Sequence, residues 1–204
     1  ELNKEAPDSE NKFVFSCKNS GRICIFTNTG QMHTVKVMDL PFGKFRDKGV
    51  PIDNVSNYDS SKEGILLIKD MAEISMSKLL FTTKQSMMKH VYGTEFDVAK
   101  RTVAATKLQE DDEVIKIELI TDQRNVILQT HEGYFLRFAI EEVPEKKKSA
   151  VGVRGMKLSG DDFVENVYFT GYSDNTSIEF KDKQIEINKI KLMKRDSKGI
   201  KVRI

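Results

Sequence analysis

One strand-and-turn pattern returns along this chain about every 50 residues, and this repetition restricts the possible folds more than any other feature. Its clearest copy covers residues 25–30 (Ile-Phe-Thr-Asn-Thr-Gly) and reappears at 128–133 as Leu-Gln-Thr-His-Glu-Gly. A copy without the glycine lies at 79–83, and a degenerate copy lies at 177–180. Short apolar runs with such a period are typical of an array of β-sheet blades. The sequence therefore predicts an all-β, propeller-like protein with about four blades.

The repeated segments are predicted to be β-hairpins, because they are rich in Ile, Val, Phe, Leu and Thr. Gly30 and Gly133 lie 103 residues apart, where a hairpin turn favours positive φ. Pro41 and Pro144 follow the two hairpins at the same interval. The predicted strands cover residues 22–28, 31–38, 64–68, 78–82, 114–120, 125–129, 134–140, 164–169 and 184–192. In the last strand, alternation predicts that Ile185, Ile187, Ile190 and Leu192 face inward.

We expect a single domain over residues 1–204, and the repeat sets approximate limits for its blades. These limits are 22–76, 77–123, 124–174 and 175–204, with 12–17 as a strand of a first or closing blade. Pairing of residues 13–17 with 199–204 would close the ring. In the alternative, the arc stays open and its two edges belong to further blades. Because an exposed apolar edge promotes aggregation, the sequence favours closure.

The composition predicts a folded domain outside the membrane. The chain has 204 residues, of which 39% are apolar and 31% charged. This length is sufficient for a hydrophobic core, and the apolar content is too high for a disordered chain. No apolar run approaches the length of a membrane-spanning helix. Cys17 and Cys24 are too few for a disulfide framework and predict a reducing, intracellular setting. The net charge is only +2, so binding to a polyanion would depend on how charge is distributed.

Side chains with catalytic or metal-binding chemistry show no convergent pattern in the sequence. His33, His90 and His131 have no cysteine or acid at metal-ligand spacing. The glycines around Arg154 lack the lysine and the strand-to-helix context of a phosphate-binding loop. The acidic pairs at 111–112 and 161–162 fit turns better than a metal or acid–base site. We therefore expect no catalytic residue, metal or cofactor in this domain.

Basic residues recur at one structural place, the connection that follows each hairpin. These connections carry Lys44, Arg46 and Lys48; Lys100 and Arg101; Lys146, Lys147 and Lys148; and Lys194, Arg195 and Lys198. We add Arg154 to this set, and as second choices Lys36, Lys89, Arg137 and Lys189, which lie within or beside the hairpins; Lys89 and Arg137 are both counted four residues past the turn glycine position. Equivalent loops of successive blades would form a positive band along a rim. Such a band suits duplex DNA, whose phosphates it would contact without reading sequence. The alternative is a set of merely solvated loops.

The segments 25–41, 130–144 and 152–158 resemble blades of the C-terminal domain in the A-type subunits of bacterial type IIA topoisomerases, DNA gyrase and topoisomerase IV. The resemblance covers about residues 12–204 and is strongest in the third blade. It implies a β-pinwheel, whose blades exchange strands and whose basic rim binds and bends duplex DNA. It also implies a cytoplasmic, nucleoid-associated protein that works with the rest of the A-type subunit, as well as with the B-type subunit of the enzyme. ATP and Mg would then act through other domains, and the isolated domain is expected to be monomeric, without membrane association.

One departure from the family concerns the gyrase box, Gln-Arg-Arg-Gly-Gly-Lys-Gly, which this sequence lacks. The nearest stretch is 194–199, Lys-Arg-Asp-Ser-Lys-Gly. Its absence favours topoisomerase IV but leaves gyrase open, since the box belongs to a first blade that this chain need not contain. Two functional hypotheses follow: sequence-independent DNA binding, or a propeller-type scaffold that docks a chromosome-organising protein. A continuous positive rim would favour the first, and an apolar patch on one face the second.

Overall fold

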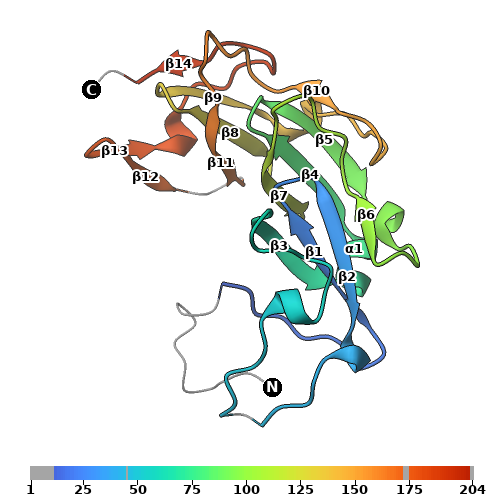
Figure 1. Cartoon of the computed structure of the whole chain (residues 1–204). Helices are drawn as coiled ribbons and strands as arrows, with labels where there is room; N and C mark the ends of the chain where they lie inside the picture. Colours follow the sequence, from blue (N-terminus) through green and yellow to red (C-terminus); the bar gives the residue numbers. More distant parts are fainter. Residues whose placement is uncertain (1–11, 45, 172–174, 203–204) are drawn as a thin grey trace.

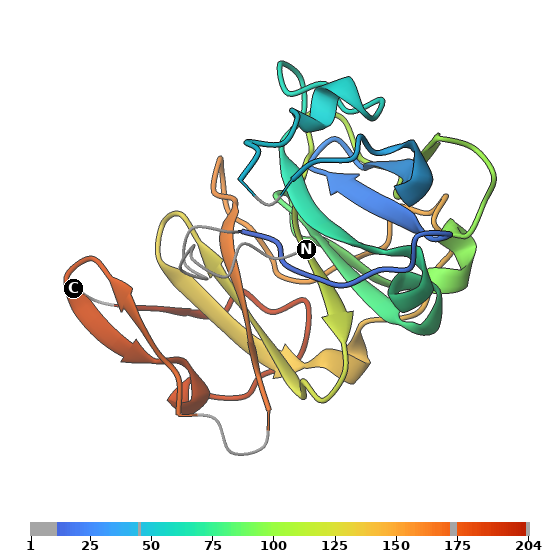
Figure 2. The ribbon, with the colours of Figure 1, turned by 90° about the horizontal axis from the view of Figure 1, so that it is seen from below.

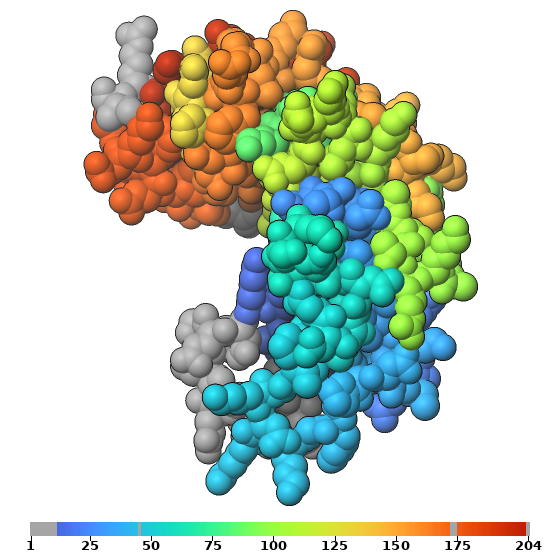
Figure 3. All heavy atoms as spheres, viewed as in Figure 1, coloured from blue at the N-terminus to red at the C-terminus, as the bar shows by residue number. Residues whose placement is uncertain are grey.

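The computed structural model describes residues 12–44, 46–171 and 175–202, and in them β-sheets dominate. These residues form three four-stranded antiparallel sheets and one two-stranded sheet. The sheets follow one another along a curved arc (Figure 1), whose concave side appears as a hollow in the space-filling view (Figure 3). Figure 2 shows the two-stranded sheet at one end of this row and the first sheet at the other. The predicted all-β pinwheel is confirmed.

Each four-stranded sheet is built around a hairpin of two six-residue strands. The hairpin strands are β1 (Arg22–Thr27) and β2 (Gln31–Lys36), β4 (Lys78–Thr83) and β5 (Met87–Tyr92), and β8 (Asn125–Thr130) and β9 (Tyr134–Ala139). The inner edge of each sheet is formed by β3 (Ile65–Asp70), β7 (Val114–Ile120) or β11 (Val164–Thr170). The last sheet contains only β12 (Ser177–Phe180) and β13 (Lys183–Glu186).

The outer edge of each four-stranded sheet is a short strand donated by the next unit along the chain. These exchanged strands are β6 (Thr102–Ala104), β10 (Val153–Arg154) and β14 (Ile200–Lys201). They pair with β2, β5 and β9 respectively, so each unit completes the sheet before it. Figure 1 shows the exchanged strands on the convex side of the arc.

A short helix follows every hairpin. The 3-10 helices η2 (Val37–Asp39), η4 (Gly93–Phe96), η5 (Ile140–Glu142) and η6 (Ile187–Lys189) each begin directly after the second hairpin strand. The first unit also has η3 (Ile52–Asn54) and the only α-helix of the described residues, α1 (Met71–Met76). Within the described residues, no helix has the length and apolar character needed to cross a membrane.

The core lies between neighbouring sheets, where alternate strand residues face each other. Phe26 of the first sheet and Phe96 of the second unit meet edge to face, with ring centroids 5.2 Å apart. Phe135 and Phe180 repeat this contact between the third and fourth sheets at 5.3 Å. Aromatic pairs of this geometry add about 0.5–1.5 kcal/mol beyond burial alone. Packing between sheets, together with strand exchange, therefore holds the arc in shape.

Three sequence predictions about strands and their pairing are wrong in the structure. Residues 13–17 form no strand; this segment runs beside the first sheet, where Lys12 Nζ lies 3.4 Å from the Ile65 carbonyl oxygen. The C-terminal strand β14 instead pairs with β9, so residues 13–17 and 200–202 do not close a ring. The strand predicted at 184–192 ends at Glu186, and Leu192 is 53% exposed. Its continuation leaves the fourth sheet because it has to reach the third.

Candidate nucleic-acid interface

The hairpins provide a register in which the basic residues of different units can be compared. Thr27, Thr83 and Thr130 each end the first hairpin strand and are 56 and 47 residues apart. η5 and η6 begin at Ile140 and Ile187, which extends the interval of 47 to the fourth unit. By this count a lysine occupies the same position in all four units: Lys44, Lys100, Lys147 and Lys194. The next position also carries a basic residue in three units: Arg101, Lys148 and Arg195.

The second residue of each basic pair is bonded to the 3-10 helix of the preceding unit. Arg101 lies 3.4 Å from Asp39 of η2. The Lys148 ammonium donates to the Glu95 carbonyl oxygen at 2.7 Å, and its amide donates to the Glu95 carboxylate at 2.9 Å. In the last junction, Arg195 bonds in the same way to Glu142: its amide to the carboxylate at 2.9 Å, its guanidinium to the carbonyl at 3.0 Å. Lys148 and Arg195 are therefore struts between units, whereas the Arg101 pair is exposed and contributes little.

The first residue of each pair is left exposed. Lys100 and Lys194 are exposed, and neither has an acidic partner within the described part of the chain. The Lys147 side chain is 82% exposed and forms a long ion pair with Glu95, with 3.4 Å between nitrogen and oxygen. An exposed pair of this kind contributes little, so Lys147 remains available to a ligand. The struts thus fix the loops, and the first residues present their charge on the convex side.

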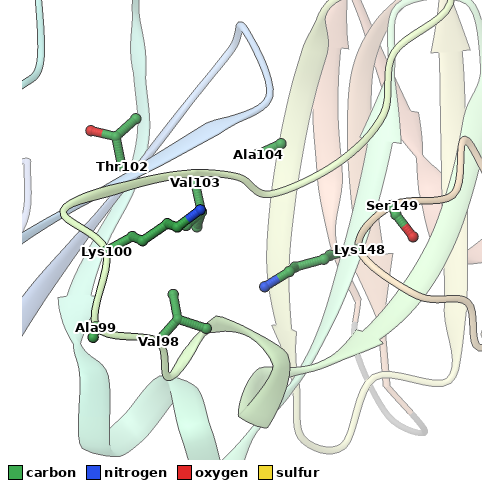
Figure 4. Close-up of a pocket in the computed structure, with 8 residues that line it drawn as sticks. All are labelled: Val98, Ala99, Lys100, Thr102, Val103, Ala104, Lys148 and Ser149. Atoms are coloured by element: carbon green, nitrogen blue, oxygen red, sulfur yellow. The ribbon is translucent and has the colours of Figure 1, made fainter.

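A cavity of about 680 Å³ lies between the basic pairs of the second and third units. Its lining residues are Val98, Ala99, Lys100, Thr102, Val103, Ala104, Lys148 and Ser149. Figure 4 shows Lys100 and Lys148 entering this space from opposite sides. The two basic loops therefore border one hollow, in which an anionic group would meet positive charge from both units.

The acidic turns occupy the opposite ends of the hairpins. Asp112 accepts a hydrogen bond from the Gln85 amide at 2.9 Å, and Asp162 from the Glu132 amide at 3.0 Å. Gln85 and Glu132 lie in the hairpin turns, whereas the basic pairs lie beside the 3-10 helices. The carboxylates are therefore used to cap turns, as predicted. No group of three or more potential metal ligands occurs within residues 12–44, 46–171 and 175–202.

Arg154 and Lys198 lie beside the exchanged strands. Arg154 forms a two-pronged ion pair with Asp196, at 2.5 Å and 3.1 Å. This pairing lowers the pKa of the Asp196 carboxyl and raises the pKa of Arg154. The Arg154 charge is thus largely neutralised, which weakens its candidacy as a phosphate contact. Lys198 is exposed and lies over the Tyr134 ring, 4.9 Å from the centroid.

Lys89 does not lie on the surface, which corrects its prediction as a DNA contact. It is fully buried, because the hairpin pairs it with Phe81 on the inward side. Its ammonium donates to the carbonyl oxygens of Lys147 at 3.0 Å, Lys148 at 2.9 Å and Ala150 at 2.5 Å. Burial lowers its pKa to about 8. Lys89 therefore holds the basic loop of the third unit from beneath.

Arg137 is likewise occupied within the fold. Its guanidinium donates to the carbonyl oxygens of Asn188 and Ile190, the second at 3.1 Å. It thus braces the fourth unit against the third and offers little charge to a ligand. Lys36 and Lys189 are exposed, and Lys189 pairs with Glu186 at 2.5 Å.

The remaining predicted contacts are exposed but differ in their surroundings. Lys146 lies in the third basic loop, where its amide bonds to the His90 carbonyl at 2.9 Å. Lys44, Arg46 and Lys48 lie in the loop that follows η2, which borders no preceding sheet in the described residues. The structure thus brings three of the four basic connections onto one edge.

The acids of the struts were missed at the sequence level, although the repeat contains their signal. Asp39, Glu95 and Glu142 are 56 and 47 residues apart, the intervals of the hairpin threonines. An acid that recurs at the same distance from the turn as a basic pair indicates a contact between the two. A comparison of the repeated acids with the basic pairs could therefore have indicated that one residue of each pair contacts an acid and the other is exposed.

An arc of hairpin blades that exchange outer strands, with a lysine repeated along its convex edge, defines a β-pinwheel domain. The family described as "DNA gyrase C-terminal domain, beta-propeller" matches residues 77–121, 124–170 and 183–203. The chain belongs to this family.

Its relatives include A-type subunits of both gyrase and topoisomerase IV. The chain is 34% identical over 161 residues to the DNA gyrase A-type subunit of Lawsonia intracellularis, covering 76% of this chain and 20% of that protein. It is 28% identical over 163 residues to the DNA topoisomerase 4 A-type subunit of Bacillus subtilis, covering 79% and 20%. The chain thus spans about a fifth of the length of these curated relatives.

Two solved structures share the fold. The C-terminal domain of DNA topoisomerase IV superposes with a TM-score of 0.80 at 24% identity, covering 89% of this chain and 58% of that one. The DNA gyrase A C-terminal domain gives a TM-score of 0.63 at 23% identity, covering 90% and 60%. Both matched chains contain structure beyond the part that this chain covers.

Proposed function

We propose that this domain binds duplex DNA without sequence specificity along its convex edge and bends it. The observation that carries the proposal is the recurrence of an exposed lysine at one position of each junction: Lys100, Lys147 and Lys194. Point charges repeated along a curved edge match a polyanion that follows the edge. Contacts to phosphates position a duplex and carry no sequence code.

The struts make this arrangement energetically useful. Because Lys148 and Arg195 fix their loops in the free protein, less conformational entropy is lost when the exposed lysines contact phosphates. Each neutralised phosphate releases counterions, which favours binding at low salt. This gain can offset a bending cost of about 1–6 kcal/mol for a site of 20–30 base pairs.

The family suggests that this activity serves a larger enzyme. We propose that the domain is part of the A-type subunit of a bacterial type IIA topoisomerase, where it orients the DNA segment to be transported. Its partners would be the rest of that polypeptide together with the B-type subunit, while ATP and Mg would act through other domains. The domain would then work in the cytoplasm at the nucleoid, and on its own it would be monomeric.

A salt titration tests the proposal. Affinity for a fluorescent duplex of about 40 base pairs, measured by anisotropy with two unrelated sequences, should be equal for both and fall steeply with salt. The triple variant K100A/K147A/K194A should weaken binding to both sequences and reduce the log–log slope by up to about 3 units.

The matched control removes three lysines away from the basic pairs. Lys62 and Lys116 are paired with Asp59 and Glu118, and Lys181 lies at the hairpin turn of the fourth sheet. The variant K62A/K116A/K181A has the same net charge as the first triple variant and should retain nearly the full slope. Equal losses in both variants would show that only net charge matters, and no loss in either would favour the scaffold hypothesis.

A further inference from the structure

One position in the second strand of each hairpin lies beneath the segment that the next unit donates. The hairpin register places His33, Lys89 and Leu136 at this position. His33 Nδ1 lies 2.9 Å from Oγ1 of Thr102 in the exchanged strand β6, and Lys89 reaches the loop that precedes β10. Leu136 instead packs in an apolar cluster. Because leucine fills this position in the third blade, the blade fold itself does not require a charge there.

The ammonium group of Lys89 has one carbonyl acceptor for each of its three N–H bonds. These acceptors are the carbonyl oxygens of Lys147 at 3.0 Å, Lys148 at 2.9 Å and Ala150 at 2.5 Å. A neutral amine has only two N–H bonds, and its lone pair would leave one of the three carbonyl oxygens without a donor. Hydrogen bonds from a charged donor are also stronger than those from a neutral one. The loop is therefore matched to the charged form of Lys89.

Two of the three acceptors belong to the backbone of the basic pair itself. Apart from Lys89, this loop is held by the contacts of Lys148 with Glu95 and by the Ala150 amide, which donates to the Lys147 carbonyl at 3.0 Å. The Lys147 side chain is 82% exposed, and Glu95 is its acidic neighbour at 3.4 Å. The place at which Lys147 presents its charge therefore depends on the bonds from Lys89.

We propose that Lys89 positions the exposed Lys147 for contact with a phosphate, and that loss of the Lys89 proton loosens loop 146–150 and weakens DNA binding. This inference rests on the proposed function. Because coupling between a proton and a ligand is reciprocal, DNA binding should also favour the protonated form of Lys89. Proton uptake on binding is then expected in the pH range in which Lys89 titrates.

The surroundings of Lys89 place this titration near neutral pH. Burial lowers the pKa of Lys89 to about 8, and the Glu95 carboxylate opposes this shift. The Phe81 ring lies 5.9 Å from the ammonium, and the core cluster that contains Phe81 has one titratable side chain among the described residues, Cys24. Burial raises the pKa of Cys24 to about 12 and lowers that of the neighbouring His90 to about 4. Cys24 and His90 are therefore neutral from pH 6.5 to 9.

DNA affinity measured at pH 6.5 to 9 and constant ionic strength tests the proposal. For the wild type, affinity should fall by up to about 10-fold between pH 7 and 9, because only the fraction with a charged Lys89 binds fully. The Lys89→Leu variant should bind at pH 7 about as weakly as the wild type does at pH 9, and its affinity should not change with pH. A wild-type affinity that is constant with pH, or an equal pH dependence in Lys89→Leu, would overturn the proposal.

Two single variants locate the effect on the arc. Lys147→Ala and Lys194→Ala remove the same charge from equivalent positions, and both should weaken binding. Lys147→Ala should lose most of the pH dependence, whereas Lys194→Ala should retain it, since the position beneath its junction holds Leu136. Equal pH dependence in the two variants would show that the titrating group does not act through the loop of Lys147, and the proposal would fail.

Hydrogen exchange of residues 146–150 in the free protein separates this inference from the proposed function. Their protection, relative to the unfolded-chain exchange rate at each pH, should fall by up to about 10-fold between pH 7 and 9 in the wild type and stay constant in Lys89→Leu. Protection that does not change in the wild type would overturn the role of Lys89 in the loop. If the protection falls as expected but DNA does not bind at any pH, the proposed function fails, and with it the part of this proposal that concerns DNA.

Discussion

At the scale of single residues, the hairpin register determines whether a basic side chain is buried or exposed. A shift of one residue along a strand moves a side chain to the other face of the sheet. Lys89 corresponds in the register to His33 and Leu136, not to Arg137, so it points into the protein. The sequence comparison placed Lys89 and Arg137 at the same position because it took residue 85 as the turn position of the second hairpin. In the structure the turn residue with positive φ is Ser86. The second hairpin has no glycine to mark its turn, so the sequence alone does not reveal this error of one position.

The buried lysine predicts a pH dependence of stability. Burial lowers the pKa of Lys89 to about 8 in the folded protein, against 10.5 when unfolded. Between pH 8 and 10.5 the unfolded chain therefore binds more protons, and stability contributed by this group rises with pH. Leucine is the residue at the equivalent position of the third blade, Leu136. The Lys89→Leu variant should therefore lack this rise of stability with pH.

Urea unfolding at pH 7.5, 9 and 10.5 measures the effect. The difference in unfolding free energy between wild type and Lys89→Leu should change with pH in favour of the wild type, whereas the other lysines cancel in the comparison. A difference that stays constant from pH 7.5 to 10.5 would mean that Lys89 titrates as it does in water.

At the scale of elements, the junction between units is formed by a 3-10 helix, a basic strut and an exchanged strand. The hairpin strands and their turns could be predicted from the sequence, because alternation and turn glycines are local signals. The exchanged strands β6, β10 and β14 could not, because strands of two or three residues show no periodicity and their partners lie in another unit. The exposed lysines were predicted correctly as surface residues, but their separation from the struts requires the contacts across the junction.

Substitution of Glu95 tests the strut formed by Lys148. Its carboxylate accepts the Lys148 amide and is only 19% exposed. Glu95→Ala should lower the unfolding free energy by about 1–3 kcal/mol, because a hydrogen bond to a largely buried charge is lost. It should also speed hydrogen exchange in residues 146–150.

Glu141→Ala serves as its control. Glu141 lies in η5, is 82% exposed and has only a 3.9 Å contact with Arg124, so its removal eliminates the same charge from the same kind of helix. We expect a change within about 0.5 kcal/mol. If the two variants behave alike, the acids act through general electrostatics and the strut has no special weight.

At the scale of the whole molecule, the arrangement of charge distinguishes a band from a spot. The arc repeats one junction three times, so a longer duplex should reach more of the exposed lysines Lys100, Lys147 and Lys194. A single basic patch would bind short and long duplexes with the same number of contacts. Because the salt dependence counts neutralised phosphates, it can separate these arrangements without a structure of the complex.

We therefore predict that the salt slope grows with duplex length. With duplexes of about 10, 20, 30 and 40 base pairs, the log–log slope should rise by close to one unit for each additional junction reached, then level off. The K147A variant lacks the middle lysine of the three. It should therefore lower the salt slope for the longer duplexes. Anisotropy titrations of each duplex with wild type and variant provide the measurement. A slope that is already complete at about 10 base pairs would place the binding at one junction, and the curved edge would then have no part in bending DNA.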